Sequence, residues 1–261
     1  MEVKNVSAKI IDINVDNIDS QDLFCKKTKK KLPGYQNKVK WIKERFKEGL
    51  KYKVLYVKEG NKETSRGMIE YIPGEYNWRG IMADGWMVIH CIWVVGKAKQ
   101  KGHGDKLLKL AIEDAKKQGM HGVVGMSAEK GGWVPKKKIY LKNGFVKVDE
   151  IEPNFSLYAL VFNKDAPKPQ FYPVNKGKQS KYSEGVSILY SDQCPYIVDL
   201  VEDLNKEYGI NKINSIKLNT CEEAQENGIY PYGTYCIICN GDISLYKHAT
   251  KKEIQKILTE D

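Results

Sequence analysis

A loop rich in glycine and lysine separates an apolar stretch of the chain from a segment with helical periodicity. It spans residues 94–106, which read VVGKAKQKGHGDK. The first amides of a helix have no partner within the helix, and the helix dipole favours an anion beside them. Gly102 and Gly104 would let phosphate oxygens approach the backbone closely. Positive charge around such a site would come from four lysines, Lys97, Lys99, Lys101 and Lys106. The loop therefore predicts an anion site, although an ordinary strand-to-helix turn fits so short a Gly-x-Gly pattern equally well.

A histidine stands in the most apolar stretch of the chain, residues 86–95, which read WMVIHCIWVV. His90 is the group there that titrates near neutral pH, so it is a candidate general base that Asp84 could orient. A buried histidine satisfied by a hydrogen bond would leave the same pattern. Glu70 and Glu75, on or just after the neighbouring predicted strand, are alternative bases. An acceptor that needs no base is a further alternative.

The loop resembles the acyl-CoA signature of the GNAT family of N-acetyltransferases, Arg/Gln-x-x-Gly-x-Gly/Ala. Lys99, Gly102 and Gly104 occupy its three defining positions, with Lys99 in place of the usual Arg or Gln. Residues 138–145, KIYLKNGF, resemble the Tyr-x-x-x-Gly-Phe segment that closes the cofactor site in the same family. Residues 68–79 and 89–94 are similar to a narrower set, GNAT proteins with a C-terminal YoaP-like domain. The resemblance covers nearly all of residues 1–163.

The resemblance implies an acyl-CoA-dependent N-acyltransferase that uses acetyl-CoA as co-substrate. It assigns Tyr140 as the acid that protonates the departing CoA thiolate, and it places a base at the position of His90. Backbone amides at Val94 and Val95 would polarise the thioester carbonyl, and Trp93 beside them would also contact the cofactor. The pyrophosphate would lie on the loop, at Lys99, Gln100, Lys101, Gly102, His103, Gly104, Asp105 and Lys106. The acceptor would be an amine of a small molecule or peptide.

A cysteine in the last third of the chain is a possible thiol site. Cys194 lies in residues 191–197, SDQCPYI, which resemble the Cys-Pro-Tyr-Cys turn of glutaredoxins. A thiol at a helix N-terminus tends to have a lowered pKa. Ile197 stands where the resolving cysteine would be, so a binding site or a remnant is favoured over dithiol chemistry. A thiol-dependent redox or electrophile-handling protein using Cys194 remains the alternative function. Cys236 and Cys239 point to opposite faces of a predicted strand, so no metal site is expected.

The elements that must position these residues alternate between strands and helices, which predicts an α/β fold. The first part is expected to form the mixed GNAT sheet with flanking helices, and the last part a small thioredoxin-like βαβαββα domain. Strands are predicted at residues 9–15, 52–57, 67–72, 86–95, 123–126, 146–149, 155–162, 186–190, 213–218, 235–239 and 243–246. Helices are predicted at residues 36–48, 105–118, 135–142 and 195–208, and after the capping boxes Thr220-x-x-Glu223 and Thr250-x-x-Glu253. Asn240-Gly241 is a hairpin signal.

Composition divides the chain into two parts. The predicted domains are residues 1–163 and 185–261, joined by a linker at 164–184 that is rich in proline and lysine, in which Phe171 and Tyr172 could anchor part of the chain. Residues 185–261 contain 7 basic and 12 acidic side chains, a net charge of −5, and residues 1–184 carry +15. Opposite charges favour docking of the two parts or attraction of a cationic acceptor.

The same composition weighs against several function classes. No apolar run is long enough to span a membrane, and no secretory signal is expected. Six unevenly spaced cysteines are typical of a reducing cytoplasm. No pattern typical of nucleic-acid-binding modules accompanies the basic charge, so nucleic acid is not an expected partner.

Overall fold

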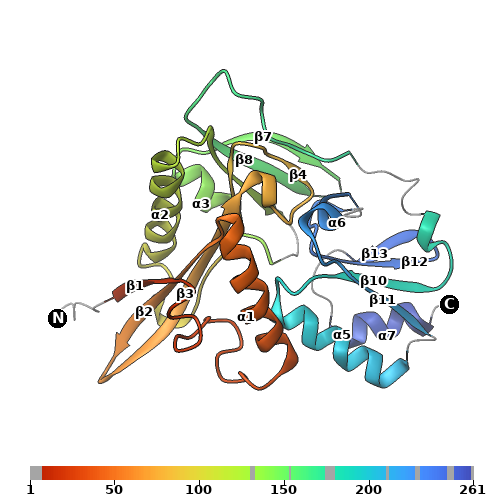
Figure 1. Cartoon of the computed structure of the whole chain (residues 1–261). Coiled ribbons are helices and arrows are strands. Elements are labelled where there is room, and N and C mark those ends of the chain that lie inside the picture. Colours follow the sequence, from red (N-terminus) through yellow and green to blue (C-terminus); the bar gives the residue numbers. More distant parts are fainter. Residues whose placement is uncertain are drawn as a thin grey trace.

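Two sheets of the computed structural model lie side by side, one formed by the first part of the chain and one by the last (Figure 1). The structure describes residues 8–129, 133–152, 154–173, 180–209, 212–226, 230–245 and 250–259. We call the part from β1 to β8 the N-terminal unit and the part from β10 to α7 the C-terminal unit. Among the helices in the described ranges, none is long and apolar enough to cross a lipid bilayer.

The sheet of the N-terminal unit has seven strands in the order β1-β2-β3-β5-β6-β8-β7. Neighbouring strands are antiparallel except β5 and β6, which are parallel and joined through a helix. The strands are β1 (Ala8–Ile13), β2 (Lys51–Glu59), β3 (Lys62–Pro73), β5 (Met87–Val94), β6 (Gly122–Ala128), β7 (Val146–Ile151) and β8 (Phe155–Val161).

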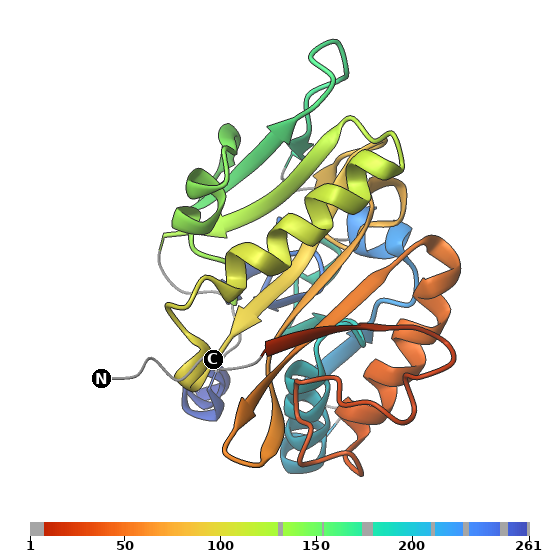
Figure 2. The ribbon, with the colours of Figure 1, turned by 90° about the vertical axis from the view of Figure 1, so that its left-hand side faces the viewer.

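Helices cover both faces of this sheet. Figure 2 shows α2 (His103–Lys117) crossing one face, where α3 (Lys137–Lys142) also packs. On the opposite face lie α1 (Pro33–Arg45) and the C-terminal unit. Short 3-10 helices are η1 (Phe46–Glu48), η2 (Gly74–Tyr76), η3 (Gly96–Ala98) and η4 (Ser180–Tyr182). The predicted mixed sheet with flanking helices is confirmed.

The C-terminal unit has the predicted order of elements. They are β10 (Val186–Tyr190), α5 (Pro195–Tyr208), β11 (Ile213–Lys217), α6 (Cys221–Glu226), β12 (Tyr235–Cys239), β13 (Asp242–Leu245) and α7 (Lys251–Thr259). Its four strands form a sheet in the order β11-β10-β12-β13, in which β10 and β11 are parallel and the other pairs antiparallel.

Local signals in the sequence explain where these elements begin and turn. In the predicted capping box of α6, the Glu223 amide donates to Thr220 Oγ1 at 3.1 Å. Asn240 and Gly241 have φ angles of 46° and 86°, as a two-residue hairpin turn between β12 and β13 requires. Tyr246, which was predicted to end the last strand, lies outside the described residues.

Part of the segment predicted as a linker forms a small sheet. β9 (Gln170–Phe171) pairs with β4 (Ile81–Met82), and the side chain of Phe171 is buried. An aromatic side chain of this size gains about 1.5–3 kcal/mol from burial, which anchors the chain between the two units.

The two units are docked through charged and polar contacts. Asp199 of α5 forms an ion pair with Lys26, and its Oδ1 accepts a hydrogen bond from the amide of Gly34 at 2.7 Å. The side-chain amide of Gln225 donates to the carbonyl oxygen of Asn77 at 2.8 Å. The Lys26–Asp199 pair joins a basic residue of the N-terminal unit to an acidic residue of the C-terminal unit, as their opposite net charges predict.

Glycines bring the two backbones into direct contact. A Cβ atom at Gly34, at the start of α1, would collide with the carbonyl oxygen of Pro195 in α5. A Cβ atom at Gly233, whose φ is 72°, would collide with the carbonyl oxygen of Trp78. Each unit therefore has a glycine at a point where the backbone of the other unit lies too close to allow a side chain.

Candidate functional site

A gap opens between the two parallel strands at the centre of the larger sheet. β5 and β6 pair over three positions only, the last of which joins Ile89 to Gly125. Both strands continue beyond that point, β5 to Val94 and β6 to Ala128. The backbone of β5 after Ile89 therefore faces β6 without pairing to it, although it still pairs with β3 on its other side.

One amide of β5 faces into this gap. The amide of Val95 donates to the carbonyl oxygen of Arg66 at 2.8 Å, so it continues the ladder with β3. Successive amides of a strand alternate between its two neighbours, so the amide of Val94 points away from β3 and into the gap. The expectation that the Val95 amide is free is wrong, because that amide is used in the ladder; Trp93, one residue before Val94, directs its amide toward β3 in the same way.

The glycine-lysine loop follows β5 and ends in a left-handed turn. Gln100 and Gly102 have φ angles of 60° and 74°, and Gly102 is the N-cap of α2. The first helical bond runs from the Lys106 amide to the Gly102 carbonyl oxygen at 3.0 Å. The amides of the preceding turn therefore lie at an exposed helix N-terminus. No atom lies within 4 Å of the position that a Cβ of Gly102 would take in the described part of the chain.

The side chains around this N-terminus differ in their availability to an anion. Lys99 and Lys101 are exposed beside the loop. His103 is buried, and its Nδ1 has no hydrogen-bond partner among the described residues. Asp105 instead faces α3, where it pairs with Lys142 and accepts a hydrogen bond from Asn143 at 3.0 Å. These two partners draw the Asp105 carboxylate, the negative charge of the first turn, toward α3.

Tyr140 lies on the α2 face of the sheet at the base of the gap. Its side chain is fully buried, and its ring stacks on Tyr158 with a centroid separation of 5.7 Å and an interplanar angle of 10°. A Cβ atom at Gly125 would collide with the Tyr140 hydroxyl, so the hydroxyl rests where pairing of β5 with β6 ends. The hydroxyl has no hydrogen-bond partner among the described residues, and burial raises its pKa. It is an uncharged donor with an unused proton.

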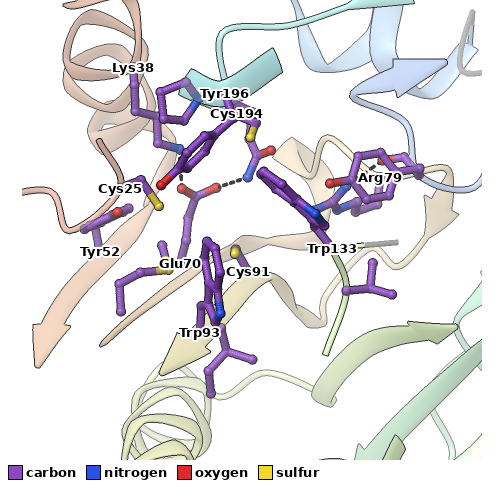
Figure 3. Close-up of a pocket in the computed structure, with 16 residues that line it drawn as sticks. Cys25, Lys38, Tyr52, Glu70, Arg79, Cys91, Trp93, Trp133, Cys194 and Tyr196 are labelled. Atoms are coloured by element: carbon purple, nitrogen blue, oxygen red, sulfur yellow. Dashed lines mark hydrogen bonds and ion pairs between the residues drawn. The ribbon is translucent and has the colours of Figure 1, made fainter. Parts of the chain in front are cut away.

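A cavity of about 210 Å³ lies on the opposite face, between the two units (Figure 3). Its wall combines residues of α1, β3 and β5 with residues of the C-terminal unit. They are Cys25, Lys38, Tyr52, Met68, Glu70, Arg79, Cys91, Ile92, Trp93, Trp133, Val134, Gln193, Cys194, Pro195, Tyr196 and Tyr232. Side chains on one strand alternate between the two faces of a sheet. β5 therefore contributes side chains to this cavity on one face and, on the other face, to the hydrophobic cluster that contains Tyr140 and Tyr158.

A buried carboxylate connects the two units at the floor of the cavity. Glu70 forms an ion pair with Lys38, and its Oε1 accepts a hydrogen bond from Gln193 of the C-terminal unit at 2.8 Å. Burial alone would raise the pKa of Glu70, but the Lys38 ammonium and the hydrogen bond from His90 lower it to about 2. Glu70 is therefore ionised throughout the physiological pH range.

His90 is bonded at both ring nitrogens. Its Nε2 accepts a hydrogen bond from the Trp78 amide at 3.0 Å, so the proton of the neutral ring lies on Nδ1, 3.2 Å from Glu70 Oε1. Burial lowers the pKa of His90 below its usual value of about 6.5. Glu70, rather than Asp84, is the carboxylate that orients the ring. Glu75 accepts a hydrogen bond from the Gly85 amide at 2.8 Å, and it does not line the cavity.

Three cysteines, Cys25, Cys91 and Cys194, contribute to the cavity wall. Burial raises the pKa of all three thiols, that of Cys91 to about 12. The lowered pKa expected of Cys194 at the start of α5 is wrong, because the effect of burial exceeds that of the two backbone hydrogen bonds to the sulfur. In the described residues, no group of three or more His, Cys, Asp or Glu side chains could hold a metal ion.

Sequence reasoning missed the residues that the second unit brings to the cavity and those that hold them. Gln193 and Tyr232 are separated from Glu70 and Arg79 by more than a hundred positions, so no local pattern connects them. Arg79 follows an aromatic residue in a predicted loop, which gives no sign of its burial. The one available signal was the opposite net charge of the two parts, which predicted that they dock.

Comparison with known proteins gives a relative that aligns along nearly the whole chain. A comparison with models of protein families finds no match. The chain is 32% identical over 253 residues to the protein described as "Uncharacterized N-acetyltransferase YoaP" of Bacillus subtilis (strain 168). The alignment covers 95% of this chain and 97% of the relative.

Solved structures match part of the chain at low identity. An acetyltransferase of the GNAT family from Staphylococcus aureus Mu50 is 15% identical, with a TM-score of 0.42, and the match covers 60% of this chain and 100% of that one. A GNAT family acetyltransferase from Brucella melitensis in complex with acetyl-CoA is 15% identical, with a TM-score of 0.38, over 64% of this chain and 96% of that one.

Proposed function

Because the chain belongs to the GNAT family of N-acetyltransferases, we propose that it transfers an acetyl group from acetyl-CoA to an amine bound between its two units. The observation that carries this proposal is the gap between β5 and β6. It has an exposed helix N-terminus at one end, a buried tyrosine hydroxyl at its base, and a cavity on the opposite face.

In the proposed complex, the pyrophosphate of acetyl-CoA binds the turn from Lys99 to Lys106. The amides of the first helical turn donate to the phosphate oxygens, and Lys99, Lys101 and Lys106 add positive charge. Gln100 and Gly102 provide the left-handed turn that exposes these amides. His103 and Gly104 contribute their backbone, as does Asp105, whose carboxylate is held by α3.

The thioester lies in the gap, beside Trp93 and Val94. The Val94 amide donates to the carbonyl oxygen, which gains negative charge as the amine attacks. The new nitrogen–carbon bond forms as the carbon–sulfur bond breaks, and the departing thiolate takes the proton of Tyr140. The acceptor approaches from the cavity, and Tyr140 stands on the other face of the sheet, so acceptor and acid reach the thioester from opposite sides.

The attacking amine must lose a proton, and we propose that water in the cavity accepts it, held by the ionised Glu70 carboxylate that His90 positions. An alkyl ammonium has a pKa near 10.4, so a base or water must take its proton. Glu70 lines the cavity, whereas His90 reaches it through Glu70. In this proposal Glu70 contacts the acceptor, and His90 positions the Glu70 carboxylate. A role of His90 as the base itself stays a prediction.

His90→Gln tests this pair. Glutamine can keep a hydrogen bond to Glu70 and to the Trp78 amide, but it does not titrate. The pKa of His90 is lowered, so the ring is neutral at pH 7 and becomes protonated only as the pH falls below about 6.5. We expect kcat/KM at pH 7 to fall about tenfold, which is less than the usual loss when a base in direct contact with the substrate is removed. We also expect the change in kcat/KM that accompanies protonation of His90 at low pH to disappear from the pH profile. An unchanged profile would remove His90 from the mechanism.

The C-terminal unit is proposed to be a thioredoxin-like domain. We assign residues 1–163 to the first domain, residues 164–184 to the linker and residues 185–261 to this second domain. The order βαβαββα and the strand order β11-β10-β12-β13 support this assignment. Ile197 occupies the position of a resolving cysteine, and Cys194 has a raised pKa, so we assign Cys194 to the wall of the acceptor cavity. The six cysteines are present as thiols, and we place the reaction in the reducing cytoplasm.

The proposed function is tested with the full chain, acetyl-CoA and a panel of amines, by following the release of free CoA. We expect acetyl-CoA to raise the melting temperature and at least one amine to accelerate CoA release. Glutathione with a disulfide substrate serves as the parallel assay for the thiol-dependent alternative. Reduction of the disulfide without binding of acetyl-CoA would overturn acetyl transfer and support that alternative.

A further inference from the structure

A buried arginine is held at the junction of the two units without a negative partner. Arg79 is 2% exposed and lines the cavity. Its Nη1 donates to the Tyr232 carbonyl oxygen at 2.7 Å and to Thr234 Oγ1 at 3.2 Å, and its Nη2 donates to the His90 carbonyl oxygen at 2.6 Å. The guanidinium carbon lies 4.2 Å from the centre of the Tyr232 ring. All of these partners are neutral.

The cavity wall therefore has an excess of positive charge. Lys38 and Glu70 neutralise each other in their ion pair, and no carboxylate lies within ion-pair distance of Arg79 in the described part of the chain. The thiols of Cys91 and Cys194 have raised pKa values and stay uncharged at neutral pH. A buried charge without a counter-ion is unfavourable, and an anionic group that enters the cavity would relieve this cost.

The guanidinium also has donors to spare. An arginine side chain has five N–H groups, and the three hydrogen bonds above occupy three of them. A planar fork of this kind suits the two oxygens of a carboxylate. Phosphate would fit the same donors, but the cavity is small and walled by Trp93, Trp133 and Tyr232, which favours a compact organic molecule with an apolar or aromatic part.

We propose that the acceptor carries a carboxylate that pairs with Arg79, as an amino acid or a short peptide with a free C-terminus does. This inference rests on the proposed acetyl transfer and names the class of its acceptor. The C-terminal unit then has a defined part in specificity, because Tyr232 and Thr234 fix the guanidinium that recognises the acceptor.

Matched pairs of acceptors test the proposal with the intact chain. Amino acids and dipeptides, including phenylalanine and phenylalanyl peptides, are compared with their C-terminal amides and with decarboxylated amines such as phenethylamine. We expect kcat/KM to be about tenfold to a hundredfold higher for the carboxylates, the range of a charge-assisted hydrogen bond. Equal or better use of the amides and amines would overturn the proposal while leaving acetyl transfer intact. CoA release with none of the acceptors would instead count against the proposed function.

Variants of Arg79 test whether this residue causes the preference for acceptors that carry a carboxylate. Arg79→Gln should bring the ratio of carboxylate to amide close to 1, mainly through KM of the carboxylate. Arg79→Lys keeps the charge and should retain part of the ratio. Arg45→Gln is the control, since Arg45 pairs with Glu48 outside the cavity. A ratio that persists in a folded Arg79→Gln protein would overturn the role of Arg79, and the wild-type comparison stands even if that variant does not fold.

Discussion

Tyr140→Phe should lower kcat for acetyl transfer about 10²- to 10⁴-fold, the usual contribution of a general acid, with little change in affinity for acetyl-CoA. The hydroxyl rests against Gly125, at the point where β5 and β6 cease to pair, and it has no partner among the described residues. Removing it therefore breaks no hydrogen bond within the described part of the protein. The variant should therefore melt at the same temperature as the parent or slightly higher, because an unsatisfied buried hydroxyl is lost.

Tyr158→Phe provides the matched control. Tyr158 stacks on Tyr140 in the same aromatic cluster, so both variants remove a hydroxyl from it. Steady-state kinetics should show the large loss for Tyr140 alone, and calorimetry should give the same acetyl-CoA affinity for both. If the Tyr140 variant retains full kcat, another group or water protonates the thiolate, and the acid assignment fails.

Gly102→Val should weaken binding of acetyl-CoA on the order of 100-fold or more. Gly102 has a φ of 74°, which costs a non-glycine residue about 1–2 kcal/mol. Its side chain would also occupy the open space before the first turn of α2, where we place the pyrophosphate. The strain lowers stability, and the loss of one or two charge-assisted hydrogen bonds to the pyrophosphate, at about 1.5–3 kcal/mol each, accounts for the loss of affinity.

Gly119→Val separates backbone strain from the loss of the cofactor site. Gly119 follows the other end of the same helix, has a φ of 67°, and also has no atom within 4 Å of a Cβ among the described residues. Both variants should lower the melting temperature by a similar amount, but only Gly102→Val should lose acetyl-CoA affinity in a calorimetric titration. Equal losses of affinity in both would mean that strain in α2, and not the loop, is responsible.

Signals that are local in the sequence predicted most of the elements and their order, although not the short strands β4 and β9. Asn240 and Gly241 form the expected hairpin turn, and Gly102 stands at the expected start of α2. The helix begins two residues before the predicted position 105, because the apolar stripe marks its buried face and not its first turn. The spatial order of the strands within each sheet was not predicted, because it depends on pairing between segments that are distant in the sequence.

The geometry of the candidate site depends on contacts between distant residues, which the pattern of residues did not contain. His90 was predicted as a base from its type and position, but its two nitrogens are engaged by Trp78 and Glu70. The pKa of Cys194 was predicted from its place at a helix N-terminus, whereas the opposite unit covers it and raises that pKa. Such effects are set by burial, which depends on the packing of both units together.

The contacts of Gly34 and Gly233 also constrain how this chain can change over generations. At both points a carbonyl oxygen of the other unit lies where a side chain would be, that of Pro195 at Gly34 and that of Trp78 at Gly233. A side chain acquired at either glycine would separate the units and open the cavity that they share, whichever unit acquires it. The two units are therefore expected to evolve together. Recombination that replaces one of them must supply a contact surface of matching shape, or the shared cavity is lost.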